Sequence, residues 1–183
     1  SAMLYTSCYS SPLGQLLLAG DEAGLTGLWF EGQKYYPRSL PPACEARGLP
    51  LFEAARRWLD QYFAGCEPDI AVPLHFTGTA FQNEVWALLC EIPYGRTATY
   101  GEIAARLAAK RGVPHLSAQA VGGAVGRNKI SLLVPCHRVI GANGSLTGYA
   151  GGLDRKARLL ALERTAPQGT PAYGRPKACG PLV

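Results

Sequence analysis

Long apolar runs, closely spaced cysteines and dense charge of one sign are all scarce in this sequence. Near the start, the longest uncharged apolar run is LLLAG, residues 16–20, and no basic segment precedes it. Such a run is too short for a secretory signal or a bilayer span. We therefore expect a protein without a membrane partner, located in the cytoplasm.

The six cysteines lie far apart, at positions 8, 44, 66, 90, 136 and 179, and no two have Cys-x-x-Cys spacing. Zinc clusters and disulfide frameworks rely on closer or more regular spacing. The sequence therefore predicts neither of these, and we expect no metal and no cofactor.

The composition is that of a globular chain, with 48% hydrophobic and 17% charged residues. A length of 183 residues suits one large domain or two small ones. The formal net charge of +5 permits binding to nucleic acid but does not establish it.

The first third reads as strands followed by a helix. The segments GQLLLAG and GLTGLWFEG are short apolar runs joined by a turn composition, which predicts a hairpin. From Leu51 the apolar residues recur at helical spacing, and Gly65 is placed to end that helix. Four prolines predict a loop over residues 35–50. A boundary between two parts is expected near residues 74–79.

The second part reads as helices with capping residues. Thr79 and Ser117 are candidate N-caps, and Thr99 with Glu102 has the spacing of a capping box. Two short helices, the second built from Ala, Val and Gly, fit a helix-turn-helix. An Ala-rich core helix is the alternative, and the pattern alone does not decide between the two.

The segment ISLLVPCHRVIG predicts an apolar strand entering a turn, and ANGSLTGYAGG predicts a glycine-rich loop. A last helix is expected over LDRKARLLALER, capped by Asp154. Residues 165–183 are rich in Pro and Gly and predict a flexible tail.

Cys136 and His137 stand side by side in that apolar segment. A thiol becomes a good nucleophile when it loses its proton, and an imidazole oriented by a carboxylate can take that proton. Glu163 is the candidate carboxylate. Adjacent residues on a straight strand point to opposite faces, so a turn or a bridging water would have to join the pair. Two ordinary core residues are the alternative for the dipeptide alone.

Taken together, PCHRVIG, NGSLTGYAGGLDRKARLLALE, IPYGRTATYGEIA and AVGGAVGRN closely resemble the O6-alkylguanine-DNA alkyltransferase family, the methylated-DNA–protein-cysteine methyltransferases. The resemblance is dense over residues 79–164. It implies an α/β N-terminal domain like ribonuclease H over residues 3–76. It also implies a mainly α winged-helix domain over residues 77–164, which binds DNA and carries the active site, followed by the tail.

The resemblance also implies the activity. Cys136 would take an alkyl group, typically methyl, from O6 of guanine and more weakly from O4 of thymine in DNA, in one irreversible step. The partner would be double-stranded DNA approached through the minor groove, and the protein would act as a monomer. An everted base is implied because O6 lies within the duplex stack.

By position, the resemblance assigns His137 as a water-mediated base, Glu163 as the residue that orients it, and Asn128 as a support for the cysteine turn. Tyr100 would assist rotation of the nucleotide and donate to the base, and Val139, Tyr149 and Ala150 would line the guanine pocket. On the DNA side, the candidates in the small-residue helix are Gln119, Ala120 and Gly122. The nearby cations Arg127, Lys129 and Arg138 are expected to contact phosphates.

Two features depart from the family pattern. Gln119 stands where the family usually has an arginine that fills the gap left by the everted nucleotide, which predicts weaker DNA binding or slower repair. Members with zinc use N-terminal Cys and His ligands, and Cys8, Cys44 and His75 do not reproduce that set.

Three other functions compete with alkyl transfer. One is a lesion-binding protein that everts alkylguanine without transfer, but relatives of that kind replace the nucleophile that Cys136 supplies here. Another is a helix-turn-helix transcription regulator, which lacks an evident ligand-sensing domain. A cysteine hydrolase is the last, and no oxyanion-hole motif is visible.

Overall fold

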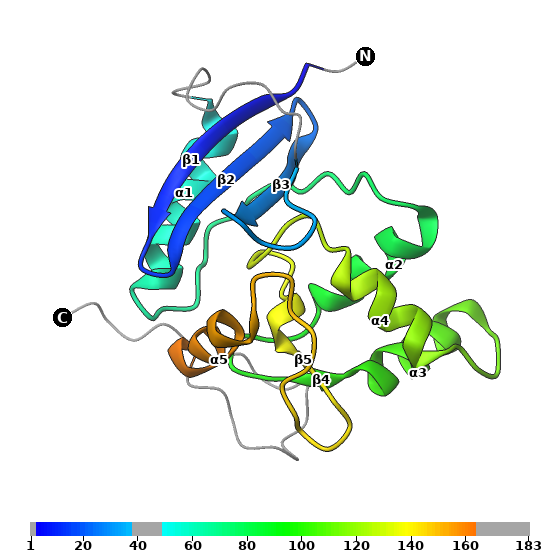
Figure 1. Ribbon diagram of the computed structural model, residues 1–183. Helices are drawn as coiled ribbons and strands as arrows, with labels where there is room; N and C mark the ends of the chain where they lie inside the picture. Colours follow the sequence, from blue (N-terminus) through cyan, green and yellow to red (C-terminus); the bar gives the residue numbers. More distant parts are fainter. Residues whose placement is uncertain (1–2, 38–48, 164–183) are drawn as a thin grey trace.

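The structure is a computed structural model that describes residues 3–37 and 49–163. It contains two parts, a sheet-and-helix unit and a mainly helical unit, arranged side by side (Figure 1). The predicted tail and most of the predicted Pro-rich loop lie outside the described residues. Within the described ranges, no helix combines the length and apolar character that a bilayer crossing requires.

The first part is an antiparallel meander of β1 (Tyr5–Ser11), β2 (Gly14–Asp21) and β3 (Gly24–Phe30), in the order β1-β2-β3. The predicted hairpin is therefore confirmed as β2 and β3. Helix α1 (Pro50–Phe63) follows and buries the apolar face predicted from its spacing. Gly65, with φ of 86°, takes the left-handed conformation just beyond that helix, as expected.

The second part begins with α2 (Ala80–Leu89), where Thr79 and Gln82 form a reciprocal capping box. The short strand β4 (Ala98–Thr99) leads into α3 (Tyr100–Arg111), capped by the Thr99 side chain. Helix α4 (Ala118–Gly126) is capped by Ser117. The predicted N-caps Thr79, Thr99 and Ser117 are therefore confirmed, although at Thr99 only the Glu102 amide donates to the cap side chain and the reciprocal bond of a capping box is not formed.

The end of the described chain corrects two expectations. Residues 131–135 form turns rather than a strand, and Cys136–Arg138 form one turn of 3-10 helix, η1. Strand β5 (Val139–Ile140) then pairs in parallel with β4. Helix α5 (Leu153–Leu162) has Gly152 at its N-cap, so Asp154 lies in the first turn instead of capping it.

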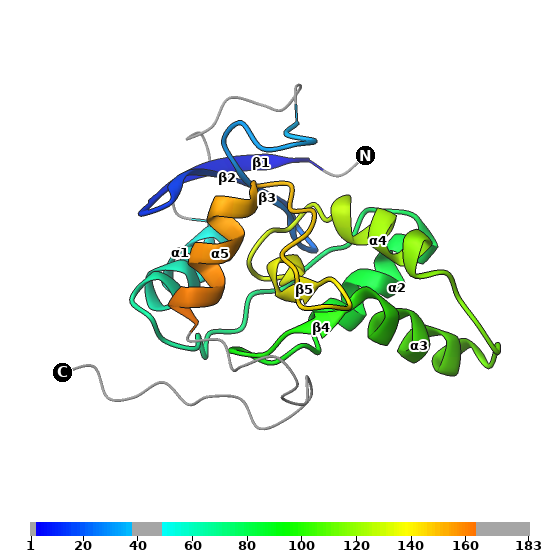
Figure 2. The same ribbon diagram turned by 60° about the horizontal axis from the view of Figure 1, so that its bottom comes forward.

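The two parts share one hydrophobic core. Leu28 of β3 donates to the carbonyl of Lys129 and accepts from Ser131 at 2.8 and 2.9 Å, so an edge of the first sheet continues into the second part. Helices α1 and α5 lie on the same side of the sheet (Figure 2). The residues before Cys136 are thus anchored on β3, and those after it on α5.

Candidate active site

Cys136 is held by a single asparagine. The side-chain amide of Asn128 donates to Cys136 Sγ at 3.1 Å, to the carbonyl of Val134 at 2.9 Å and to that of Ile130 at 3.3 Å. Its oxygen accepts from the amide of Ile130 at 3.0 Å. One buried side chain therefore ties both ends of the turn together and places a donor on the sulfur.

That turn requires an unusual backbone. Leu132 has φ of 72°, in the left-handed region that non-glycine residues rarely adopt. Such a residue costs of order 1 kcal/mol and persists only where its surroundings fix it. The Leu132 side chain is buried in the core, and Asn128 bonds the backbone on either side of it, at Ile130 and at Val134. The strain lies four residues from the reactive thiol.

His137 and Glu163 form a buried pair. His137 Nε2 lies 2.5 Å from Glu163 Oε2, and both side chains have no exposed surface. Arg138 Nε and the amide of Gly95 donate to the other oxygen at 2.8 and 3.1 Å, and the Tyr62 hydroxyl donates to Oε2 at 2.7 Å. Four donors thus surround one carboxylate, and the neighbouring His137 and Arg138 hold its pKa well below the usual range despite burial.

This arrangement fixes the tautomer of His137. An ionised carboxylate only accepts, so Nε2 carries the proton and Nδ1 of the neutral ring is free to accept one. Burial lowers the pKa of His137, and Glu163 opposes that shift. Among the described residues, Nδ1 is buried and has no hydrogen-bond partner. The ring is therefore a neutral base whose accepting nitrogen is not used by the fold.

The thiol itself is buried. Cys136 is 6% exposed, and burial raises its pKa, while the Asn128 hydrogen bond and the charge of Lys156 act in the opposite direction. A buried thiolate is costly unless nearby donors and cations stabilise it. The site supplies both, in the Asn128 amide and the Lys156 ammonium.

Sequence models of two protein domains match almost the whole of the chain. One, described as 6-O-methylguanine DNA methyltransferase, ribonuclease-like domain, matches residues 4–76. The other, described as 6-O-methylguanine DNA methyltransferase, DNA binding domain, matches residues 80–165. The chain belongs to the 6-O-methylguanine DNA methyltransferase family. Its two-part architecture is that of the family.

Individual proteins agree with this assignment. The chain is 49% identical over 161 residues to the methylated-DNA–protein-cysteine methyltransferase of Methanosarcina acetivorans, covering 87% of this chain and 98% of the relative. It is 43% identical over 162 residues to that of Haemophilus influenzae, covering 88% and 87%. The crystal structure of Mycobacterium tuberculosis OGT in complex with DNA superposes with a TM-score of 0.74 at 44% identity, covering 87% and 92%.

The structure corrects one expectation for a methyltransferase of this family. Arg138, predicted among the phosphate contacts, is 7% exposed, and its guanidinium is engaged by Glu163 and by the carbonyl of Ile92 at 2.8 Å. Its ring partner is Tyr94, 5.7 Å from the guanidinium carbon. Arg138 therefore belongs to the interior support of Glu163 and does not face a DNA backbone.

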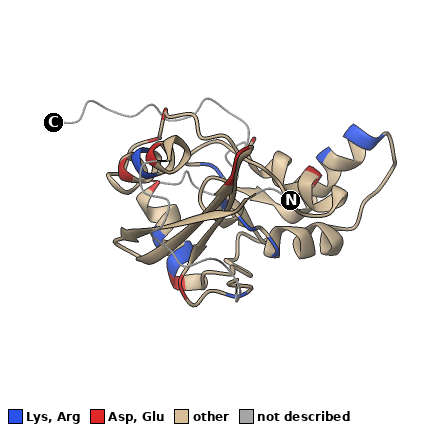
Figure 3. Cartoon of the chain, turned by 90° about the horizontal axis from the view of Figure 1, so that it is seen from above, with Lys and Arg blue, Asp and Glu red and all other residues tan. Residues whose placement is uncertain are grey.

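The other candidates for DNA contact lie at the surface. Gln119 and Ala120 are exposed near the start of α4, and a Cβ at Gly122 would lie 3.6 Å from the Tyr100 ring. Helix α4 carries no charged residue, and Lys and Arg positions are spread over several elements (Figure 3). These placements leave their roles in DNA binding as predictions.

The loop between β5 and α5 forms a wall beside the thiol. The Tyr100 hydroxyl donates to the carbonyl of Thr147 at 3.2 Å, which joins α3 to this loop. Burial raises the pKa of Tyr149 well above its usual value, and the nearby Cys136 adds to the shift. The carbonyl of Ala150 accepts from the amide of Lys34 at 3.0 Å. The structure thus brings Tyr100 and Tyr149 to the site, beside Val139 of β5.

Lys156 was missed by the sequence reasoning. It has no exposed surface, and its ammonium donates to the carbonyl of Val139 in β5 and to that of Thr147 in the loop between β5 and α5. Burial lowers its pKa to about 8. The available signal was its position three and four residues before Leu159 and Leu160, on the apolar face of the last helix.

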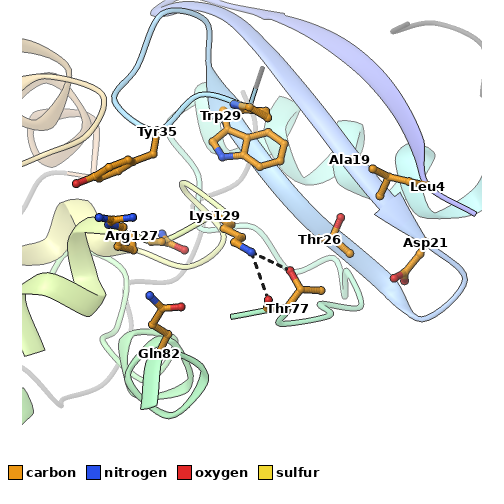
Figure 4. Close-up of a pocket in the computed structure, with 12 residues that line it drawn as sticks. Leu4, Ala19, Asp21, Thr26, Trp29, Tyr35, Thr77, Gln82, Arg127 and Lys129 are labelled. Carbon is orange, nitrogen blue, oxygen red and sulfur yellow. Dashed lines mark hydrogen bonds between the residues drawn. The ribbon is translucent and has the colours of Figure 1, made fainter. Parts of the chain in front are cut away.

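A separate cavity of about 520 Å³ lies on the sheet face opposite α1 (Figure 4). Arg127 stacks on Tyr35 there, 4.1 Å from the ring centre, and Lys129 bonds the carbonyl of Thr77 at 3.3 Å. Asn128 lines this cavity, but Cys136 does not. Arg127 and Lys129, two of the three cations predicted to contact phosphate, therefore border the same cavity.

Potential metal ligands among the described residues lie apart from one another. Over residues 3–37 and 49–163, no group of three or more His, Cys, Asp or Glu side chains is arranged to hold an ion. His75 instead pairs with Asp21 at 2.7 Å. Cys90 and Cys136 are free thiols, whereas Cys66 is disulfide-bonded, which the cysteine spacing did not predict.

Proposed function

We propose that this chain repairs alkylated DNA by transferring the alkyl group from O6 of guanine, and more weakly from O4 of thymine, to Cys136 Sγ. The observation that carries the proposal is the site around the thiol. Asn128 donates to the sulfur, and a neutral His137 held by Glu163 keeps its accepting nitrogen free. Family membership fixes the chemistry to which this geometry is matched.

The step is an in-line displacement. The thiol proton passes to His137 Nδ1 through a bridging water, and the sulfur forms a bond to the alkyl carbon while the carbon–O6 bond breaks. The guanine leaves as an anion, which a donor such as the Tyr100 hydroxyl stabilises. Burial raises the pKa of Tyr100, so it stays protonated and able to donate. The product is a thioether, which no group in the site can cleave, so each molecule acts once.

DNA would reach the site with its target base everted. A thiol that is 6% exposed cannot touch an atom inside an intact stack, so the nucleotide must turn out, at a cost of a few kcal/mol that alkylation damage reduces. We propose that α3 and α4 act as a helix-turn-helix with a wing, and that α4 enters the minor groove of double-stranded DNA. Its small uncharged side chains suit close approach without a base code.

The proposal extends to the domain plan and assembly. Residues 3–76 would form a ribonuclease-H-like domain, supported by the β1-β2-β3 meander with α1, and residues 77–164 the winged-helix domain. One thiol and one base suffice for the step, so a monomer is proposed as the active form. Gln119 would fill the gap left by the everted nucleotide.

Intact-mass measurement tests the transfer. The protein is incubated with duplex DNA that contains one O6-methylguanine, beside Cys136→Ala and undamaged duplex as controls. A gain of one methylene per chain, absent in both controls, is the expected result. Tight binding to the lesion without a mass change would instead identify a lesion-binding protein. The proposal is also refuted if damaged DNA causes no mass gain and is not bound.

A further inference from the structure

Tyr62, from the first part of the chain, reaches the pair that activates the thiol. Its hydroxyl donates to Glu163 Oε2 at 2.7 Å and lies 3.4 Å from His137 Nε2, across a sequence separation of 101 and 75 residues. Tyr62 has no exposed surface. Neither the assigned catalytic groups nor the DNA-facing residues include it.

Aromatic contacts fix the ring of Tyr62 independently of its hydroxyl. It stacks on Trp58 one turn earlier in α1, with ring centres 5.2 Å apart and planes 7° apart. Tyr94 and His137 meet it edge-on, at 6.3 and 6.4 Å. Because the ring cannot turn away, its hydroxyl is delivered to one place, the carboxylate oxygen that His137 also uses.

We infer that Tyr62 is a positioning residue for the alkyl transfer. Its hydroxyl donates to Glu163 Oε2, the oxygen that His137 Nε2 also contacts, and so reduces the negative charge that this oxygen presents to the imidazole. The effect of Tyr62 on the rate of alkyl transfer rests on the proposed function. Its effect on the pKa of His137 does not, because the contact is present without DNA.

The remaining donors decide what losing this hydroxyl would do. Arg138 and the amide of Gly95 hold the other oxygen of Glu163, so the carboxylate stays in place without Tyr62. What changes is the charge on Oε2, since a hydrogen bond to a carboxylate stabilises its ionised form. With that bond removed, Glu163 attracts the proton on His137 more strongly, and the imidazole stays protonated to a higher pH.

Other charged or titratable groups also surround His137 and must be held constant. Glu163, Arg138 and Lys156 act on His137 directly, Tyr149 and Glu67 act on Glu163, and Cys136 is the neighbour of His137 in the chain. None of them is altered by Tyr62→Phe, which keeps the stacked ring and deletes one oxygen. The variant therefore isolates the hydroxyl.

Imidazole NMR measures the effect without any reaction. The chain has three histidines, so His75→Gln and His115→Gln leave the His137 signals assigned by elimination. We expect Tyr62→Phe to raise the pKa of His137 by about half a unit or more. Leu59→Ala, a buried truncation one turn earlier in α1, and Tyr9→Phe, which deletes a hydroxyl bonded to Asp60 at 2.6 Å, serve as controls that leave it unchanged.

The second readout is the pH profile of alkylation by O6-methylguanine duplex. Tyr62→Phe should shift the acid limb to higher pH, so that the second-order rate falls about threefold or more on the acid side of that limb and recovers toward the wild-type rate as the pH rises. Leu59→Ala should lower the unfolding temperature without moving that limb. A Tyr62→Phe variant that matches Leu59→Ala in both the NMR titration and the profile overturns the inference. Absence of alkylation in the wild type refutes the proposed function, and the NMR result still decides the role of Tyr62.

Discussion

Replacing Lys156 by methionine should change how the stability of the fold depends on pH. Burial lowers the pKa of this lysine from 10.5 to about 8. A shift of this size corresponds to a cost of about 3 kcal/mol for carrying the charge in the folded state. Because the folded form loses its proton at lower pH than the unfolded form, this cost is present in full below pH 8 and fades as the pH rises toward 10.5.

The absolute stability at one pH does not isolate this cost. Lys156→Met also removes the donors to the carbonyls of Val139 and Thr147, and a hydrogen bond from a charged donor contributes about 1.5–3 kcal/mol. The two effects oppose each other at neutral pH. Only the charge effect varies with pH between 7 and 9.5, so the slope reports it separately.

Urea unfolding of the wild type and Lys156→Met from pH 7 to 9.5 measures that slope. The free energy of unfolding of the wild type should rise relative to the variant by about 2 kcal/mol over this range. Lys110→Met, which removes a lysine at the exposed end of α3, should show a constant difference from the wild type. A constant difference for Lys156→Met as well would refute the assignment of a buried charge.

The same substitution bears on reactivity. The Lys156 charge lowers the pKa of the Cys136 thiol, so its loss should reduce the thiolate population and the rate of modification. A rise of one unit in the thiol pKa lowers that population about tenfold at neutral pH. The rate of iodoacetamide labelling of Cys136 in DNA-free protein reports the thiolate population. An unchanged rate would show that Lys156 only supports the loop between β5 and α5 through its hydrogen bonds.

Three further changes test other parts of the site. Asn128→Ala should lower the unfolding free energy by about 2–4 kcal/mol and slow labelling of Cys136, as urea melts and mass measurement would show, because it removes four hydrogen bonds of the strained turn. The pKa of Glu163 is lowered in the folded state, so its stabilisation is present above the unfolded-state pKa of 4.5 and is lost as the pH falls. The unfolding free energy of Glu163→Gln should therefore depend less on pH in acid than that of the wild type. Near neutral pH this variant should lose about 3–5 kcal/mol, because Arg138 loses its carboxylate partner. Gln119→Arg should raise the second-order repair rate, because arginine adds a charge and a longer side chain at α4. A rate that does not rise, measured by mass spectrometry of samples quenched at successive times, would contradict the proposed role of residue 119.

Local signals in the sequence predicted the elements that depend on neighbours. Thr79 and Ser117 cap their helices because capping needs only residues three positions apart. The apolar segment before Cys136 was predicted as a strand because an apolar run alone does not distinguish a strand from buried turns. What bends it is the side chain of Asn128 together with the left-handed Leu132, and neither leaves a periodic signal.

The parts of the site that escaped prediction are those joined over long distances. Glu163 was named as the carboxylate partner of His137 from the sequence and again through the resemblance, and the structure confirms their contact. Tyr62 lies 101 residues from the carboxylate it binds, and nothing around it in α1 differs from an ordinary core tyrosine. Arg138 was assigned to phosphate because an arginine beside a reactive cysteine in a basic chain reads as a surface cation, whereas the fold buries it against Glu163.

The buried charges around the thiol explain why a sulfur so well covered can still react. Glu163 contributes one negative charge, Arg138 and Lys156 contribute two positive charges, and His137 is neutral. With Cys136 protonated, this interior carries a net positive charge, so a thiolate forms next to an excess of buried cations. Burial still raises the pKa of the thiol, but the Lys156 charge and the Asn128 hydrogen bond act in the opposite direction and make the buried thiolate less costly than a lone one would be.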